Sequence, residues 1–537
     1  MTQLLNDCFE SYSSLRTEMR RWLNQSMMLD PPGPNDGGED EANYALAWFP
    51  HYLITGDSNV LKHFNTLKDA LAGWVKRDCF HGYEKKAEAH HGPEPFLLFL
   101  PRYIGLKPED TEAISLLTDA AEHIGNWVSE IPDWYDYTRD TFIGYNIGTE
   151  FVDNQDKDRY ELAEHFRFIH IALATYKITG EKRYVDWAIR YGQKRAERIL
   201  TASEPMPLLW DLNENGLSEE EVNEKNLHRL VASGHHIPGD PLAGIENLLA
   251  SGAIYALGDL YLLTGEEIYK SAARRIVEPL VTSLIDPFND PAAAAISYYR
   301  WTFRDTSFDT VIEAGLQDLP TDPPELLALV FPQEIRRREL GVGKRSDMAY
   351  WGEWTDDGSV SPIREPSTAT LTLAYQLTGD VAYAQRAIQN ASLRLNIARR
   401  VLRGGREHAD MGGAVCSVAA GHGRNWGHGA VTACYGPLLL GTREIFGMVE
   451  PLIIIKHEDG TLHHPSELLS LVRPVVSSDN IEIIFYNSGN STLNFSWQHQ
   501  LMQIDQLDHR IEKITESDKN LWYGETLEAN RMLKRIL

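Results

Sequence analysis

A tripeptide, Thr-Gly-Asp or Thr-Gly-Glu, recurs along the chain, each time between an apolar segment and an amphipathic one. The copies occupy residues 55–57, 179–181, 264–266 and 378–380, and the last three are followed by a tyrosine at the same offset. Glycine readily takes the left-handed conformation that ends a helix, and an acidic residue is favoured at the start of the next helix. The repeat therefore predicts antiparallel helical hairpins closed by short turns.

The two halves of each hairpin differ in character. The first segment is apolar nearly all round and the second is apolar on one side, which predicts an inner and an outer layer of helices. Further hairpins are expected near 95–130 and 292–316, the latter weak. A helix at 4–28 is expected to pack against one at 429–446 and close a ring of seven pairs, or six without the weak pair. An open solenoid fits the sequence less well, because the turns within the hairpins are short but the links between hairpins are long, whereas a solenoid would have short connections of both kinds.

These patterns predict a mainly α protein, an (α/α)6 or (α/α)7 toroid of helical hairpins over residues 1–446. Residues 447–537 alternate in hydrophobicity and contain turn sequences, which indicates a small antiparallel β unit. A charged terminal helix over about 507–537 is expected to follow it.

The charge and composition of the chain exclude some classes of binding partner. The chain has 51 Lys and Arg against 77 Asp and Glu, a net charge of -26, which disfavours nucleic acid. No secretory signal pattern and no apolar run of about 18 residues stands in the sequence, so we expect no membrane span. The four cysteines are scattered. Reduced thiols in a cytoplasmic protein are therefore expected, and a homo-oligomer is compatible with the sequence.

The long links between hairpins, on the side away from the tripeptide turns, concentrate His, Trp, Tyr and Arg. Aromatic faces stack on sugar rings, and forked polar groups bind hydroxyls and carboxylates, so their coincidence on one rim predicts a sugar pocket. Any one cluster alone is more often structural, and His165 and His170 are expected to be core histidines. The candidate substrate-binding residues are His90, His91, Tyr145, Asn146, Trp210, His235, Arg300, Arg345, Trp351, His422, Arg424, Asn425 and Trp426.

The sequence contains no recognisable binding motif for a metal or a nucleotide cofactor. The His-His pairs at 90–91 and 235–236 stand in no zinc-site spacing, and the cysteines form no Cys-x-x-Cys. The paired glycines at 403–406 and 421–424 match neither a P-loop nor a dinucleotide fingerprint. We therefore expect no metal and no cofactor.

With its Thr-Gly-Asp/Glu-x-x-Tyr turns at 179–184, 264–269 and 378–383, the segment 1–446 resembles the six-hairpin glycosidase-like superfamily, the (α/α) toroid enzymes. The resemblance implies a carbohydrate-active enzyme, since that fold hosts glycoside hydrolases, uronate polysaccharide lyases and sugar epimerases. No family's catalytic motif matches this chain, so no catalytic residue is carried over from a relative.

Two reactions remain open. A hydrolase needs two carboxylates, one on each side of the glycosidic bond, and the candidates are Glu88, Glu94, Asp136, Glu150 and Asp240. A lyase neutralises a uronate and removes a proton with Tyr or His, for which Tyr299 and His236 are candidates. The prediction is hydrolysis of an anionic, uronic-acid-containing saccharide, with Arg424 and Asn425 on its carboxylate. Elimination is the alternative, and an epimerase or a non-catalytic helical scaffold comes after it.

Overall fold

The computed structural model is mainly helical, with small antiparallel sheets. It describes residues 2–27, 52, 57–89, 92–124, 127–153, 155–227, 230, 241–283, 292–317, 327–330, 350–354, 360–362, 366, 368–401, 440–442, 445–446, 455–456, 462–463, 465–478, 480–497 and 500–515. None of the helices in these ranges combines the length and the apolar character needed to cross a bilayer.

The helices carry most of the described chain. The α-helices are α1 (Thr2–Met27), α3 (Ser58–Asp78), α4 (Leu100–Leu106), α5 (Thr111–His123), α6 (Arg167–Thr179), α7 (Lys182–Thr201), α8 (Glu219–Glu224), α9 (Ala243–Ala250), α10 (Ala253–Thr264), α11 (Glu267–Val277), α12 (Ala292–Phe303), α13 (Asp309–Gln317), α14 (Thr368–Thr378) and α15 (Val381–Val401). Shorter helical segments are η1 (Pro95–Phe99), η3 (Asp156–Asp158), η4 (Ala163–Phe166), η5 (Glu278–Ser283) and η7 (Val476–Ser478).

The tripeptide turns join α6 to α7, α10 to α11 and α14 to α15, as predicted. Their glycines are left-handed, with φ of 75° at Gly180, 72° at Gly265 and 73° at Gly379. The threonine links the two helices: Oγ1 of Thr179 donates to the carbonyl oxygen of Thr175 (2.9 Å) and accepts from the N–H of Glu181 (3.2 Å). Thr264 and Thr378 make the same pair of bonds. One side chain therefore satisfies a helix end on each side of the turn.

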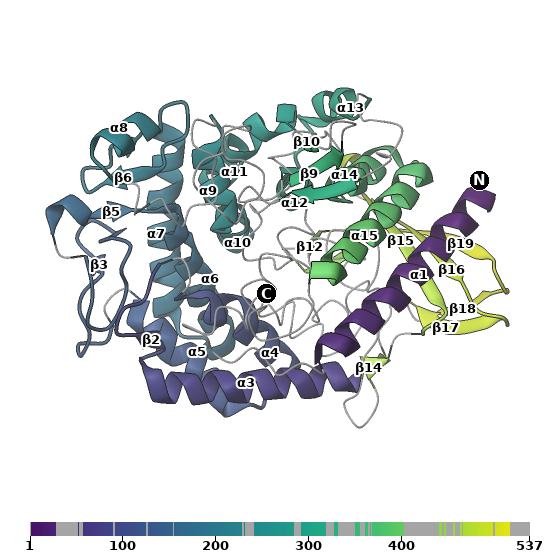
Figure 1. Cartoon of the computed structure of the whole chain (residues 1–537), viewed down its shortest axis with the longest axis horizontal. Helices are drawn as coiled ribbons and strands as arrows, with labels where there is room; N and C mark the ends of the chain where they lie inside the picture. The colour runs from purple at the N-terminus through teal and green to yellow at the C-terminus, as the bar shows by residue number, and fades with distance from the viewer. Residues whose placement is uncertain are drawn as a thin grey trace.

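Burial separates the two members of a hairpin. Residues 167–175 of α6 are buried all round, whereas α7 buries one side and exposes the other. Along the chain α5 packs on α4 and α6, α6 on α7, and α7 on α10 and α11. Then α10 and α11 pack on α12, α12 on α14, and α14 on α15. Figure 1 shows these hairpins following one another around the molecule in chain order.

The first helix packs far along the chain. α1 lies against α15, with Leu15 and Met19 buried as predicted, and the ring of Phe9 stacks on that of Tyr486 at 4.5 Å. The side chain of Trp22 lies outside the described residues. The expected partner helix at 429–446 is wrong in its last part, because Leu440–Thr442 (β11) and Ile445–Phe446 (β12) form an antiparallel pair. Gly441 and Thr442 are weak helix formers, which favours this outcome.

The strands fall into two groups. Those in the links are β1 (Cys79–Phe80), β2 (Tyr83–Glu84), β3 (Tyr135–Asp136), β4 (Thr141–Phe142), β5 (Tyr160–Glu161), β6 (Leu209–Asp211), β7 (Gly216–Leu217), β8 (Leu327–Val330), β9 (Tyr350–Trp354) and β10 (Val360–Pro362). Those after β12 are β13 (Ile455–Lys456), β14 (Leu462–His463), β15 (Leu468–Val475), β16 (Asn480–Asn487), β17 (Leu493–Trp497), β18 (Gln500–Ile504) and β19 (His509–Thr515).

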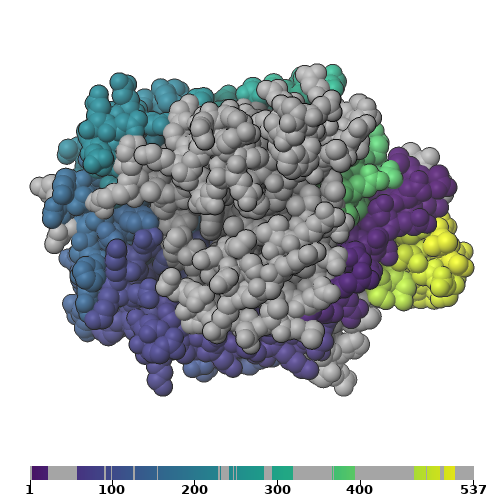
Figure 2. Space-filling model, in the orientation of Figure 1, coloured from purple at the N-terminus to yellow at the C-terminus, as the bar shows by residue number. Residues whose placement is uncertain are grey.

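The C-terminal β unit consists of the antiparallel sheet β15-β16-β19 and the hairpin β17-β18. Figure 2 shows it as a lobe beside α1. Arg473 of β15 donates to the carbonyl oxygens of Gln376 (3.1 Å) and Leu377 (2.9 Å), and pairs with Glu482 at 2.8 Å. The end of α14 is thereby fixed to the sheet. The predicted terminal helix is wrong over 509–515, where β19 completes the sheet by pairing with β16. Residues 516–537 lie outside the described residues.

Candidate functional site

Two long links, 79–94 and 131–160, run side by side and are joined through their backbones. The N–H of Ala89 donates to the carbonyl oxygen of Tyr145 (2.8 Å), and the N–H of Ile147 donates to that of Ala87 (2.9 Å). Glu88 and Asn146 face each other in an antiparallel bridge. This junction brings together three residues that the sequence predicted for the site, Glu88, Tyr145 and Asn146.

The junction presents a carboxylate and a phenol to each other. The hydroxyl of Tyr145 donates a hydrogen bond of 2.6 Å to Oε2 of Glu88, and both side chains are half-buried. The hydroxyl donates and the carboxylate oxygen accepts, so this hydrogen bond holds the carboxylate in one orientation.

A buried carboxylate fixes the neighbouring backbone. Asp153 accepts hydrogen bonds from the N–H groups of Tyr145 (2.7 Å) and Asn146 (2.9 Å), and from the amide nitrogen Nδ2 of Asn146 (2.9 Å). Gly144 is needed beside it, since its φ is 159° and a Cβ there would lie 2.6 Å from the Asp153 side chain. Asp153 therefore fixes the backbone conformation at Tyr145 and Asn146, and with it the direction in which their side chains project.

His165, just before α6, supports the same segment. Its Nδ1 accepts from the N–H of Leu162 (3.1 Å), so Nε2 carries the proton and donates to the carbonyl oxygen of Gly144 (2.9 Å). Burial, followed by the charge of Arg195, lowers the pKa of His165 to about 3, so the imidazole is neutral at physiological pH. His165 is a satisfied core histidine, as predicted. His170 bonds through Nε2 to the carbonyl oxygen of Gly252 at 3.1 Å.

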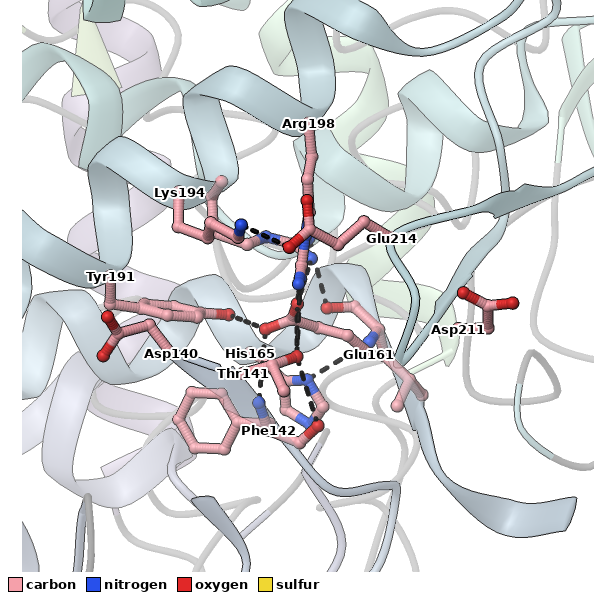
Figure 3. A network of polar contacts seen from close by, with 12 residues as sticks. Asp140, Thr141, Phe142, Glu161, His165, Tyr191, Lys194, Arg198, Asp211 and Glu214 are labelled. Atoms are coloured by element: carbon pink, nitrogen blue, oxygen red, sulfur yellow. Dashed lines mark hydrogen bonds and ion pairs between the residues drawn. The ribbon is translucent and has the colours of Figure 1, made fainter. Parts of the chain in front are cut away.

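Figure 3 shows the buried network behind this segment. The carboxylate of Glu161 accepts from the hydroxyls of Tyr191 (2.7 Å) and Thr141 (2.9 Å), and it pairs with Arg195 (3.3 Å) and Arg198. Glu161 is fully buried, so this charge is out of a substrate's reach. The network is structural: it fastens β4, which leads to Tyr145, onto the outer helix α7.

A second buried ion pair lies at the start of the inner helices. Oε1 of Glu94, directly before η1, meets Nη1 of Arg167, the first residue of α6, at 2.6 Å. Their side chains are 0% and 3% exposed. A buried pair of this kind fixes the relative position of the two helices, because removing either partner leaves an uncompensated charge. The prediction that Glu94 is a catalytic carboxylate is therefore not supported, because its side chain is fully buried in this ion pair.

The structure places other candidates away from Glu88. Tyr299 and Arg300 lie toward the C-terminal end of α12. Tyr299 donates to Asp305 (2.6 Å), and Arg300 binds Asp309 through two nitrogens at 2.7 Å each. Figure 1 shows the adjacent α13 on the opposite side of the molecule from β2. Neither residue is brought together with Glu88 and Tyr145.

Two further candidates have local partners. Trp210 is 2% exposed and packs under Arg195, whose Cζ lies 4.8 Å from the indole centroid. Glu150 is exposed and pairs with Lys85 at 2.8 Å. Trp210 therefore belongs to the core of the link, and Glu150 to its surface.

The remaining candidates lie outside the described residues, at least in their side chains. They are His90, His91, His235, His236, Asp240, Arg345, Trp351, His422, Arg424, Asn425 and Trp426. The predicted gathering of the long links on one rim is thus not addressed for His235, His236 and Asp240, because 231–240 lie outside these ranges. In the described part of the chain, no three His, Cys, Asp or Glu side chains gather as metal ligands would.

Sequence reasoning missed the residues that hold the site in place, Asp153 and Glu161. Each is an acidic residue in a polar stretch, and its role depends on partners brought from elsewhere in the fold. The one local signal was Gly144, since a glycine next to Tyr145-Asn146 indicates a close approach of another chain segment.

Comparisons with known proteins give no relative: no family model matches this sequence, and neither the curated proteins nor the solved structures contain a match to it.

Proposed function

We propose that this protein is a carbohydrate-active enzyme that hydrolyses glycosidic bonds in an anionic, uronic-acid-containing saccharide. The single observation that carries the proposal is the half-buried Glu88, oriented by the hydroxyl of Tyr145 at 2.6 Å. The sequence predicted Glu88 for catalysis, and the hydrogen-bonded junction of the 79–94 and 131–160 links holds its side chain in a fixed orientation.

The proposed architecture is a toroid of helical hairpins. In its favour, successive hairpins pack on one another from α4 to α15, and α15 packs on α1. Nη2 of Arg20 in α1 then lies 3.8 Å from the carboxylate of Asp57, the residue that caps α3. This contact connects the last members of the series to the first. In a toroid, the links before the inner helices share one rim, where an extended substrate binds.

The preference for an anionic substrate has local support. Lys85 and Lys86 are both exposed directly before the junction. Lys85 pairs with Glu150, whereas Lys86 has no carboxylate partner within the described part of the chain. In a chain with a net charge of -26, an unpaired ammonium two residues from Glu88 makes the local field favourable for a carboxylate.

In the proposed hydrolysis, Glu88 acts on the sugar from one side of the scissile bond, either as the base that activates water or as the nucleophile. A second carboxyl group must protonate the leaving oxygen. Asp240 remains the sequence-based candidate for that role. Asn146, beside the carboxylate, would bind a sugar hydroxyl or the uronate through its amide.

Elimination is the second candidate, and the Tyr145–Glu88 hydrogen bond favours it specifically. A phenol that removes the proton next to a uronate needs a route by which its own proton leaves, and Glu88 accepts from the hydroxyl directly. In this reading Tyr145 replaces Tyr299, whose hydroxyl is engaged by Asp305.

One experiment separates these functions. The protein is incubated with oligosaccharides of galacturonate, mannuronate, guluronate and glucuronate, and with neutral ones, while reducing ends and ultraviolet absorbance are followed. Reducing ends without new absorbance support hydrolysis, whereas matching absorbance from an unsaturated product supports elimination. No cleavage of any saccharide contradicts both and leaves an epimerase or a helical scaffold.

A further inference from the structure

The hairpin after Asn146 carries an unusually accessible aromatic ring. Phe151 is 57% exposed and lies in the loop of this hairpin, directly before the bridge between Ile147 and Val152. Phe80 and Tyr137 are also exposed, but His81 lies at 4.1 Å from the Phe80 ring and Arg190 at 5.4 Å from the Tyr137 ring. No ring or cation covers Phe151 in the part of the chain that the structure describes.

The hairpin is held rigidly against the link that carries Glu88. The N–H groups of Glu150 and Phe151 both donate to the carbonyl oxygen of Lys85, at 3.0 and 2.9 Å, and that of Thr149 donates to Glu84 at 3.0 Å. A Cβ on Gly148 would lie 2.3 Å from the Lys85 oxygen, so only glycine allows this approach. The exposed ring is therefore fixed in place by several main-chain contacts.

The backbone of Phe151 also lies close to that of Glu88. Phe151 bonds to Lys85, and three residues of chain, at most about 11 Å when fully extended, separate Lys85 from Glu88. Leaving a phenylalanine in water forgoes about 2 kcal/mol of burial. A ring held open and rigid at this place suits a flat apolar partner, and the C–H face of a sugar ring is such a partner.

We infer that Phe151 is a stacking platform for a sugar unit next to the one that reacts at Glu88, so that the protein prefers chains of several sugars. The inference rests on the proposed function. In this proposal the 79–94 and 131–160 links bind the substrate through two side chains, the apolar ring of Phe151 and the charged ammonium group of Lys86.

The test is native gel electrophoresis in gels containing polygalacturonate, alginate or neutral dextran, which reports binding without any cleavage. Phe151→Ala should weaken retention by a polyuronate roughly tenfold, the usual scale of one aromatic contact. Phe151→Trp should restore it. Phe80→Ala, which removes an exposed ring of the same type, should behave like the wild type. Equal retention of the wild type and Phe151→Ala, or no retention of the wild type by any of these glycans, overturns the inference.

Kinetics add an independent readout if cleavage is found. Phe151→Ala should raise KM for long oligosaccharides and leave kcat unchanged, since the ring contacts no reacting atom. For the shortest oligosaccharide that is cleaved, KM should also be unchanged, because that substrate does not reach the ring. An equal loss on short and long substrates would contradict the platform while leaving the proposed reaction intact. Retention by polyuronate without any cleavage would instead contradict the proposed reaction and leave the platform intact.

Discussion

The Nε2–H of His165 donates a hydrogen bond of 2.9 Å to the carbonyl oxygen of Gly144, the residue before Tyr145. A core histidine at the start of an inner helix thus holds the backbone of the candidate site. This bond and the one from Leu162 together require a neutral imidazole, because Nδ1 accepts from the N–H of Leu162 while Nε2–H donates. The integrity of the site is therefore coupled to the protonation of a buried group.

Acid should destabilise the protein through its buried histidines. Burial lowers the pKa of His63 to about 4 and that of His165 to about 3. The unfolded chain takes up these protons near pH 6.5, so below that value it binds more protons than the folded state. Stability should fall by about 2 kcal/mol per histidine between pH 7.5 and 5, measured by urea unfolding. His165→Phe should reduce this dependence.

Replacing Glu88 by Gln should abolish most activity while preserving the fold. The amide oxygen still accepts from Tyr145, but the side chain can no longer act as base or nucleophile. We expect kcat to fall by about two to four orders of magnitude without a change in melting temperature. Glu313→Gln, on the exposed side of α13, serves as the matched control. Near-normal turnover in Glu88→Gln would remove Glu88 from the mechanism.

Asp153→Asn should affect both stability and activity. An asparagine places an N–H donor where the carboxylate now accepts three hydrogen bonds from Tyr145 and Asn146. The unfolding free energy should drop by about 1–3 kcal/mol, and activity should fall because Tyr145 loses its orientation. Asp186→Asn, exposed on α7, should change neither quantity. Unaltered activity in Asp153→Asn would show that Tyr145 needs no such support.

The three hairpin glycines should differ in their tolerance of alanine. Gly180 and Gly265 have left-handed φ but open space around the missing Cβ, so alanine should cost about 1 kcal/mol. At Gly379 the new Cβ would lie 2.7 Å from Nη1 of Arg473, whose hydrogen bonds to the end of α14 would be disturbed. There the loss should reach about 2–3 kcal/mol, compared by urea unfolding at pH 7.5. Equal losses at all three positions would mean that the Arg473 contact contributes nothing.

The hairpins could be predicted because their signal is local. Thr179, Gly180 and Glu181 make the turn from three adjacent residues, so the pattern repeats wherever the structure repeats. β19 shows the opposite case. Its charged sequence reads as a helix, and its partner, β16, is identified only by pairing across the sheet.

The candidate site could be predicted only in part, because some of its residues are brought together by the tertiary fold rather than by local sequence. The composition of the links identified Glu88, Tyr145 and Asn146, whereas Tyr299 and Arg300 were assigned to the same rim. Counting residues from the start of α12 puts both toward its C-terminal end, where the chain turns into α13. Composition identifies the chemical type of a residue, but the length of its helix decides which end it occupies.

The contact between Phe9 and Tyr486 sets a condition on the order of folding. α1 is synthesised long before α15 and β16, the elements that cover it. Closing so long a loop is slow, and it cannot begin until those segments have left the ribosome. Until then the apolar stripe of α1 is exposed to solvent and to other nascent chains. Shielding this stripe, by a chaperone or by transient local packing, should therefore determine the yield of the folded protein.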